Sequence, residues 1–318
     1  MRAMRAALCC IALLLAPAAQ AADKVVGGSL GGQAPLWAFY VAMHKGFLAA
    51  EGIELELNFA QSGPAVTQQL TAGSLDVALS VGITSPIHAI DKGAPLALIR
   101  IVGNVAPYAL IAKAGFKSIA DLKGKTIATG QLADITTVYF ERMMAAHGLS
   151  KGDYQVLSVG VAAARYAALK AGVADAAIVL PPLNFQAAAA GFPTLGLTAD
   201  YVKDLPFTGM AVNRRWAAAN VSVARRILAA TDKSIAWLAD AGHRDEAIDL
   251  LVKAGKGSRE DAQASYEYLS RMSYFEPSSK VSRAKLQNLI DVEKRAGSVD
   301  QTLTVERLVM PGLTELTD

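Results

Sequence analysis

The segment IELELNFAQSGP, residues 53–64, contains the pattern that determines the fold. Its first seven residues alternate apolar and polar side chains, and this period of two is typical of a strand with one buried face. Ser62, Gly63 and Pro64 then open a helix, because Ser caps a helix start and Pro suits the first turn. Gly73 ends that helix. A strand joined to a helix by a few residues is the repeating unit of α/β folds.

The same unit recurs on both sides of this segment. Strands are expected at residues 24–27, 76–80 and 97–102, with helices between them. From Pro107 a second series of strands and helices runs to Gly191. Such short connections build parallel sheets that are covered by helices.

In the last third of the chain, the sequence pattern predicts helices only, near residues 222–241, 244–254, 259–272 and 282–296. Helices without a sheet of their own must pack on one of the two α/β units, and we expect the first. The chain then crosses between the units twice, near residues 103–107 and 206–213. The predicted organisation is therefore two parallel-sheet lobes joined by a double-crossover hinge, with lobe 1 formed by residues 22–106 and 207–318 and lobe 2 by residues 107–206.

The N-terminus predicts a secretory signal peptide, residues 1–21. Arg2 and Arg5 precede the apolar stretch 6–16, and AQA at 19–21 is a cleavage signal. The apolar stretch has about half of the roughly 20 residues that span a bilayer. Both cysteines lie in this segment, so the mature chain has no disulfide and no thiolate metal site. We expect an exported protein that is not embedded in a membrane.

Charge and motif content exclude several functions. The 31 Lys and Arg residues nearly balance the 28 Asp and Glu residues. The chain therefore lacks the strong positive electrostatic field that attracts nucleic acid. The four histidines are scattered, without the H-x-x-x-H spacing of a metal site. No phosphate-binding G-x-x-x-x-G-K-(S/T) loop is present. We therefore expect no metal, no cofactor and no nucleic-acid partner.

Four blocks of sequence resemble the signatures of one family, the nitrate/sulfonate/taurine-binding, pyrimidine-precursor-like periplasmic solute-binding proteins. They are AMHKGFLAAEGI (42–53), AGSLDVA (72–78), DLKGKTIA (121–128) and AALKAGVADA (167–176). The resemblance implies a bilobal type II periplasmic-binding-protein fold that closes on a small molecule. It also implies a periplasmic location and an inner-membrane ABC permease as partner, and we expect a monomer.

Most residues of these blocks are expected to shape the fold. The aspartates should begin strands or accept hydrogen bonds from loop amides. The glycines should end helices, where a left-handed backbone is needed; they are Gly46, Gly73, Gly124 and Gly172.

The loops between strands and helices should hold the ligand. In open α/β sheets, ligands bind at the carboxyl ends of strands, where helix N-termini attract anions. The candidate ligand-binding residues are Gln33, Trp37, Ser62, Gly63, Ser80, Thr84, Tyr108, Gly130, Gln131, Arg165 and Pro181. Arg165 is the charged candidate, because a guanidinium forks onto a carboxylate or sulfonate. Structural roles are the alternatives: Ser62 as a cap, Trp37 as core and Arg165 as a solvated side chain. The expected solute is a sulfonate, carboxylate or similar anion, with a neutral heterocycle as the alternative.

Two other functions fit parts of the sequence. GGSLG at 27–31 matches the G-x-S-x-G nucleophile elbow, which would make Ser29 the nucleophile of a secreted serine hydrolase. The motif comes about eight residues into the mature chain, before any sheet can flank it, so we expect no enzyme. A ligand sensor of the same fold shares every feature described above.

Overall fold

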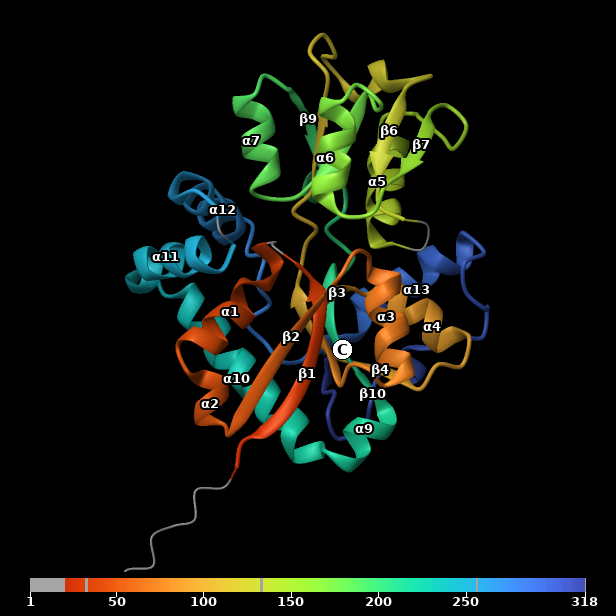
Figure 1. Ribbon diagram of the computed structural model, residues 1–318. Coiled ribbons are helices and arrows are strands. Elements are labelled where there is room, and N and C mark those ends of the chain that lie inside the picture. Colours follow the sequence, from red (N-terminus) through yellow and green to blue (C-terminus); the bar gives the residue numbers. More distant parts are fainter. Residues whose placement is uncertain (1–20, 32–33, 132–133, 256, 318) are drawn as a thin grey trace, which may run out of the picture.

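The computed structural model describes residues 21–31, 34–131, 134–255 and 257–317 of the chain. Figure 1 shows two lobes, each built on one five-stranded sheet with helices against it. In lobe 1 the strand order is β2-β1-β3-β10-β4. These strands are β1 (Asp23–Leu30), β2 (Ile53–Ala60), β3 (Val77–Gly82), β4 (Leu96–Gly103) and β10 (Thr208–Asn213). The helices before the first crossing are α1 (Trp37–His44), α2 (Phe47–Ala50), α3 (Gly63–Ala72) and α4 (Thr84–Asp91), with a 3-10 turn at Ala34–Leu36.

Lobe 2 is built on the sheet β7-β6-β8-β5-β9. Its strands are β5 (Ala109–Ala112), β6 (Thr126–Thr129), β7 (Gln155–Ser158), β8 (Ala176–Val179) and β9 (Thr194–Leu197). Its helices are α5 (Ile135–Ala146), α6 (Ala162–Lys170), α7 (Leu183–Ala189) and α8 (Thr198–Tyr201), with a 3-10 turn at Ile119–Leu122. The predicted α/β class with two lobes is confirmed.

The C-terminal part is helical, as predicted, and α10 packs on α1 and α2 of lobe 1. Its helices are α9 (Arg214–Ala219), α10 (Val221–Ala239), α11 (Arg244–Gly255), α12 (Arg259–Arg271), α13 (Arg283–Arg295) and α14 (Val305–Leu308), with a 3-10 turn at Ala241–His243. Two short strands that the sequence pattern did not predict, β11 (Val281–Ser282) and β12 (Leu316–Thr317), pair in parallel.

The prediction of wholly parallel sheets was wrong, because each sheet contains one strand of opposite direction. In lobe 1, β10 is antiparallel to β3 and β4. In lobe 2, β5 is antiparallel to β8 and β9. Both strands directly follow a crossing between the lobes. A strand that enters a lobe from the hinge runs away from the hinge, whereas the other strands of the same sheet run toward the hinge.

Two segments connect the lobes, one after β4 and one before β10. They lie together, because the amide of Phe207 donates to the carbonyl of Gly103 at 2.9 Å. The amide of Asn104 donates to the carbonyl of Tyr274 at 2.8 Å, which ties the first segment to the C-terminal part. The second crossing ends at β10, so most of the predicted range 206–213 belongs to the sheet of lobe 1.

Two aspartates of the signature blocks have the same structural role in the two lobes. Asp76 exchanges two hydrogen bonds with Val26: its carboxylate accepts from the Val26 amide at 2.8 Å and its own amide donates to the Val26 carbonyl at 2.9 Å. Asp175 repeats this exchange with Thr126, at 3.0 and 2.7 Å. Each aspartate directly precedes a strand, β3 or β8, as predicted, but the amides that donate to them lie in strands β1 and β6 rather than in loops. The four signature glycines all have positive φ, from 73 to 80°.

Replacing Asp175 with Asn is expected to destabilise the protein at neutral pH and to flatten its response to acid. The hydrogen bond from the Thr126 amide, helped by Lys113, holds the pKa of Asp175 below its ordinary value. Such a carboxylate contributes stability above its unfolded pKa of about 4, and that stability is lost as the pH falls through the lowered folded pKa. The urea midpoint, measured from about pH 7 down to about pH 2, should therefore fall less in Asp175→Asn than in the wild type. Glu54→Gln, at an exposed position of β2, is the control and should keep the wild-type slope; identical slopes for Asp175→Asn and wild type would contradict the prediction.

Candidate functional site

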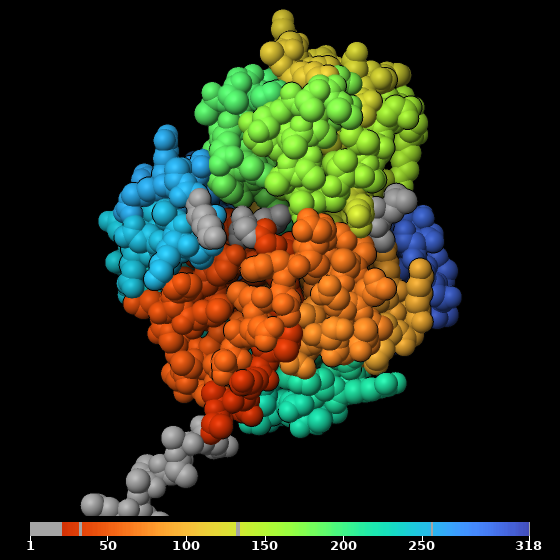
Figure 2. All heavy atoms as spheres, viewed as in Figure 1, coloured from red at the N-terminus to blue at the C-terminus, as the bar shows by residue number. Residues whose placement is uncertain are grey.

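The cavity between the lobes consists of two neighbouring chambers that share four lining residues. Both are lined by Leu30, Tyr108, Asp134 and Leu180. The inner chamber, with a volume of about 30 Å³, is completed by Ser29, Pro35, Leu36, Gly63, Ser80, Gly82, Ile135, Phe207 and Thr208. The outer chamber, with a volume of about 20 Å³, is completed by Gln61, Ser62, Thr136, Gly160, Val161, Ala162 and Arg165. Both are small, so a solute can occupy them only if the lobes move apart to admit it. Figure 2 shows lobe 2, in yellow and green, lying directly on lobe 1 in red and orange.

The outer chamber contains a buried cation that forms no direct ion pair with a carboxylate of the described residues. Arg165 lies in the first turn of α6 and is only 3% exposed. Its Nη1 donates to the carbonyl of Gly160 at 2.9 Å and to Oγ1 of Thr136 at 3.4 Å. Its guanidinium lies 5.6 Å from the ring centre of Tyr108, and its Nε is buried without a hydrogen-bond partner. The nearest carboxylate, Asp134, reaches the guanidinium only through the hydroxyl of Thr136. A buried charge without a direct ion pair is costly, so this guanidinium is suited to an anion that enters the cavity.

Asp134, Thr136 and Tyr108 form a hydrogen-bonded cluster beside Arg165. Asp134 caps α5, and its Oδ1 accepts from the amide of Thr136 at 2.9 Å and from the Thr136 hydroxyl at 2.6 Å. The hydroxyls of Thr136 and Tyr108 are 2.9 Å apart. Burial, with the nearby charge of Asp134, raises the pKa of Tyr108 to about 12, so the phenol keeps its proton.

The inner chamber is bordered by hydroxyl groups of lobe 1. Ser29 Oγ donates to the carbonyl of Ser80 at 3.3 Å, and Ser80 Oγ donates to Oγ1 of Thr208 at 3.1 Å. The hydroxyls of Thr208 and Tyr274 are 3.2 Å apart. The Phe207 ring lies edge-on to the rings of Tyr108 and Tyr274. The cavity therefore has a cationic end in lobe 2 and a hydroxyl-rich end in lobe 1.

Five of the predicted ligand-binding residues line the cavity, namely Ser62, Gly63, Ser80, Tyr108 and Arg165. Ser62 also caps α3, accepting from the Ala65 amide at 3.3 Å. Gln33 lies outside the described residues. The other candidates do not line either chamber: Trp37, Thr84, Gly130, Gln131 and Pro181.

These other candidates have identifiable positions. Trp37 is in the core, where its indole N–H donates to the carbonyl of Ala247 at 3.0 Å and its ring meets Tyr266 edge-on. Thr84 is fully buried and Gln131 is exposed. Gly130 lies behind Asp134, because a side chain added there would come within 3.0 Å of that carboxylate carbon. Pro181 follows the cavity residue Leu180.

Sequence reasoning missed several lining residues. Asp134 was not among the candidates, although a residue that caps the helix after a strand, as Asp134 caps α5, is well placed to face the cavity. Thr136 follows it by two residues and has the same signal. Phe207 and Thr208 come from the second crossing, and nothing in the hydrophobic pattern marks them.

Ser29 lacks the surroundings of a nucleophile. The GGS sequence lies within β1 rather than at a strand-to-helix turn, and Gly28 is required by packing, since a side chain there would come within 2.1 Å of Leu75. The side chain of Ser29 bonds to the Ser80 carbonyl. The four histidines contact other partners: Tyr40, Glu293, Tyr201 and Trp237. No base is therefore within reach of Ser29 among the described residues.

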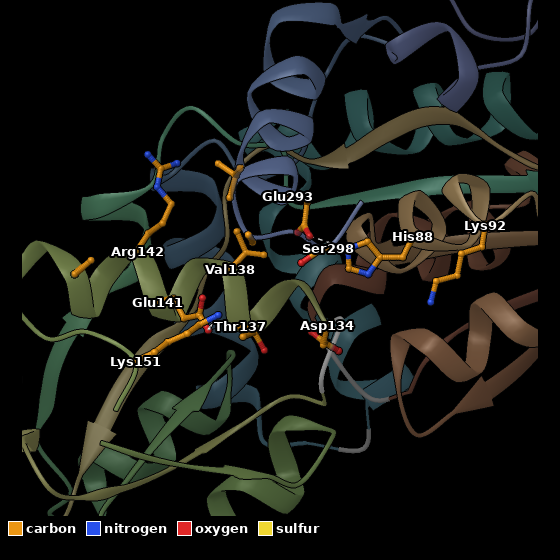
Figure 3. A pocket seen from close by; sticks show the side chains of 13 residues that line it. His88, Lys92, Asp134, Thr137, Val138, Glu141, Arg142, Lys151, Glu293 and Ser298 are labelled. Carbon is orange, nitrogen blue, oxygen red and sulfur yellow. Dashed lines mark hydrogen bonds and ion pairs between the residues drawn. The ribbon is translucent and has the colours of Figure 1, made fainter. Parts of the chain in front are cut away.

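A larger groove opens on the flank of the cavity, between α4, α5 and α13. It shares Asp134 with both chambers, and Figure 3 shows the side chains that line it. Four of its charged groups form two pairs: His88 Nε2 lies 2.7 Å from Glu293 Oε2, and Lys151 Nζ lies 3.0 Å from Glu141 Oε1. Arg142 pairs with Asp204, outside the groove. Because most of these charges are paired, we take the interlobe cavity, where the buried Arg165 forms no ion pair with the described residues, as the candidate site.

A contact outside the cavity also joins the lobes, and we call it the interlobe latch. Gln186 on α7 donates from Nε2 to Oδ2 of Asp261 on α12, at 2.7 Å. Phe185 on α7 meets Tyr268 on α12 edge-on, with ring centres 5.7 Å apart. The latch involves none of the residues that line the two chambers, so it favours contact between the lobes independently of the cavity.

Removing the latch is expected to open the ligand-free protein. The double variant Phe185→Ala and Gln186→Ala loses one aromatic pair and one hydrogen bond, worth together about 1–2 kcal/mol. Small-angle scattering without ligand should then give a larger radius of gyration. Phe192→Ala, which removes a ring that contacts Tyr166 within lobe 2, should leave the radius unchanged. An unchanged radius in the double variant would show that the latch does not control opening.

Two kinds of structural feature are absent from the described residues. None of their helices has the length and apolar character that crossing a membrane requires. No group of three or more His, Cys, Asp or Glu side chains in that part of the chain is arranged to hold a metal ion.

Comparison with known proteins gives a consistent picture. A family model described as NMT1/THI5 like matches residues 34–244. The riboflavin-binding protein RibY of Chloroflexus aurantiacus is 29% identical over 221 residues, which are 68% of this chain and 61% of that protein. This chain thus spans less than two thirds of the length of that curated relative.

Two solved structures are similar over most of this chain. The alkanesulfonate-binding protein SsuA from Xanthomonas axonopodis pv. citri, bound to MOPS, has a TM-score of 0.77 at 20% identity, and the match covers 90% of this chain and 98% of that one. The periplasmic nitrate-binding protein NrtA from Synechocystis PCC 6803 has a TM-score of 0.73 at 18% identity, with 88% and 83% covered. At these identities the likeness shows the fold, which is the bilobal periplasmic-binding-protein fold.

Proposed function

Since this chain belongs to the NMT1/THI5-like family, we propose that it is the periplasmic solute-binding component of an ABC transporter. In this role it captures a small anionic organic solute, such as a sulfonate or carboxylate, and has no catalytic activity. Support comes from the bilobal fold and from relatives whose names state that they bind alkanesulfonate, nitrate and riboflavin. The proposal includes export by the leader at residues 1–21 and delivery of the solute, by a monomer, to a membrane permease.

The observation that carries the anion assignment is the buried Arg165. Its Nε has no partner, and the N-termini of α3 and α6 border the same space. A bound sulfonate or carboxylate would supply the missing acceptor and the counter-charge together.

The binding mechanism follows from the position of the cavity. Arg165 and Tyr108 belong to lobe 2, whereas Ser80 and Gly63 belong to lobe 1. A solute that contacts all four stabilises the arrangement in which the lobes meet, so binding shifts the open–closed equilibrium toward closure. The closed shape is then the form that a permease recognises.

A thermal-shift screen tests the proposal. The protein, expressed with its leader and purified from the periplasm, is melted with nitrate, alkanesulfonates, taurine, aliphatic and aromatic carboxylates, pyrimidines and riboflavin. A ligand that binds only the folded state raises the melting temperature with its concentration, in proportion to RT ln(1 + [L]/Kd). A saturable shift with sulfonates or carboxylates, without turnover, is the expected result. A response to riboflavin or a pyrimidine alone would refute the anion assignment but keep the receptor role, and hydrolysis of an ester that Ser29→Ala abolishes would refute both.

A further inference from the structure

Asp134 is the second charged side chain of the interlobe cavity, and the hydroxyl of Thr136 lies between it and Arg165. It is half-buried, lines both chambers and forms no ion pair with the described residues. Figure 3 shows its carboxylate at the edge of the flanking groove, apart from the pairs within that groove. Its Oδ1 is occupied by Thr136. Its Oδ2 points toward the start of α3, since it lies 3.7 Å from where a Gly63 side chain would begin.

The hydrogen bonds around Thr136 fix the direction of every donor in the cluster. A carboxylate can only accept, so the Thr136 hydroxyl must donate its single hydrogen to Asp134, 2.6 Å away. The Tyr108 hydroxyl, 2.9 Å from Thr136, must therefore donate to Thr136 rather than accept from it. The guanidinium of Arg165 donates to the same oxygen. The phenolic oxygen of Tyr108 then has only acceptor capacity left for any further partner.

The cavity consequently presents two kinds of group to a solute. Arg165 presents a positive charge and an unused N–H donor at Nε. Asp134 Oδ2 and the Tyr108 oxygen present only acceptors, one of which is negatively charged. A hydrogen-bond donor on the solute satisfies these two acceptors. A second anionic group can bond to neither of them and is repelled by the negative charge of Asp134.

From this arrangement we propose that Asp134 determines the specificity of the site. The preferred solute has one anionic group for Arg165 and one hydrogen-bond donor, an ammonium, amine or hydroxyl group, for Asp134 and Tyr108. Solutes with two negative charges are excluded. This inference rests on the proposed function, because it divides the anions between those that the cavity accepts and those that it rejects.

Four sulfonates of similar length provide the test: ethanesulfonate has no donor, isethionate has a hydroxyl, taurine has an ammonium and sulfoacetate has a second negative charge. Titration calorimetry of the full protein should rank taurine or isethionate at least about tenfold tighter than ethanesulfonate, with sulfoacetate weakest. Asp134→Asn keeps an oxygen that can cap α5 and removes the charge. In this variant sulfoacetate should gain at least about tenfold relative to ethanesulfonate, and the advantage of the donor compounds should shrink.

The control is Glu141→Gln, on the same helix, because Glu141 lines the flanking groove but neither chamber. Its ranking should equal that of the wild type. If the wild type binds sulfonates and Asp134→Asn keeps the same ranking, the role of Asp134 is refuted while the proposed function stands. If neither protein binds any of the four, the sulfonate assignment fails and the inference falls with it. If Asp134→Asn melts early, Asp134→Ser takes its place, because Ser is also a good helix cap. Its ranking of the four sulfonates then supports or refutes the role of Asp134 in the same way.

Discussion

Replacing Arg165 with Met is expected to weaken solute binding by about 10- to 100-fold, because hydrogen bonds to a charged group contribute about 1.5–3 kcal/mol. Met keeps much of the length and the apolar stem of the side chain and removes only the guanidinium. The loss should appear in titration calorimetry with whichever anion gives the largest thermal shift. Loss of affinity alone would fit damage to the fold, so the melting temperature without ligand is the second measurement.

Without ligand, the Arg165→Met variant should melt close to the wild type. The substitution leaves the Gly160 carbonyl without its donor, which is unfavourable, but it also removes a buried cation that forms no direct ion pair, which is favourable. Arg142→Met is the matched control, since Arg142 lies on α5 outside the cavity and pairs with Asp204 at 2.9 Å. Its affinity should be unchanged. Wild-type affinity in the Arg165→Met variant would remove Arg165 from the site.

The fold could be predicted from sequence because its determinants are local. Alternating residues at 53–59, caps such as Ser62 and stops such as Gly73 each fix a strand, a helix start or a helix end within a few positions. Strand direction is different. β5 and β10 have the same buried, apolar composition as their neighbours, and only the chain path through the hinge makes them antiparallel. That path depends on the packing of whole lobes, which no short window contains.

The site could be predicted only in part, for a similar reason. The sequence located the strand-to-helix loops, and five of the proposed residues do line the cavity. It could not determine which way each side chain points within a loop. Trp37 turns inward because it meets Ala247 and Tyr266, which are more than 200 positions away. Phe207 and Thr208 reach the cavity because the second crossing passes beneath it.

Removal of the Phe207 ring is expected to cost a large part of the protein's stability. It is 2% exposed and lies at the hinge, where its ring meets three tyrosines edge-on. Tyr108 and Tyr139 of lobe 2 have ring centres 5.2 and 5.9 Å away, and Tyr274 of the C-terminal part is 6.3 Å away. Phe207→Ala should therefore lower the free energy of unfolding by about 3–5 kcal/mol, the usual cost of emptying a buried aromatic site.

Because Phe207 lies between the lobes, its replacement should also change the shape of the melting transition. Its ring is packed by both lobes, so it couples their unfolding. With Ala at this position, calorimetric melting should broaden or separate into two transitions, because each lobe keeps its own sheet and core but loses the contact that links them. Phe192→Ala is the matched control, since that ring is partly exposed and contacts only Tyr166 of its own lobe. It should cost less and leave the shape of the transition unchanged. A single sharp transition in Phe207→Ala, with a loss no larger than that of Phe192→Ala, would mean that the lobes are coupled through the latch and the cavity walls rather than through the hinge.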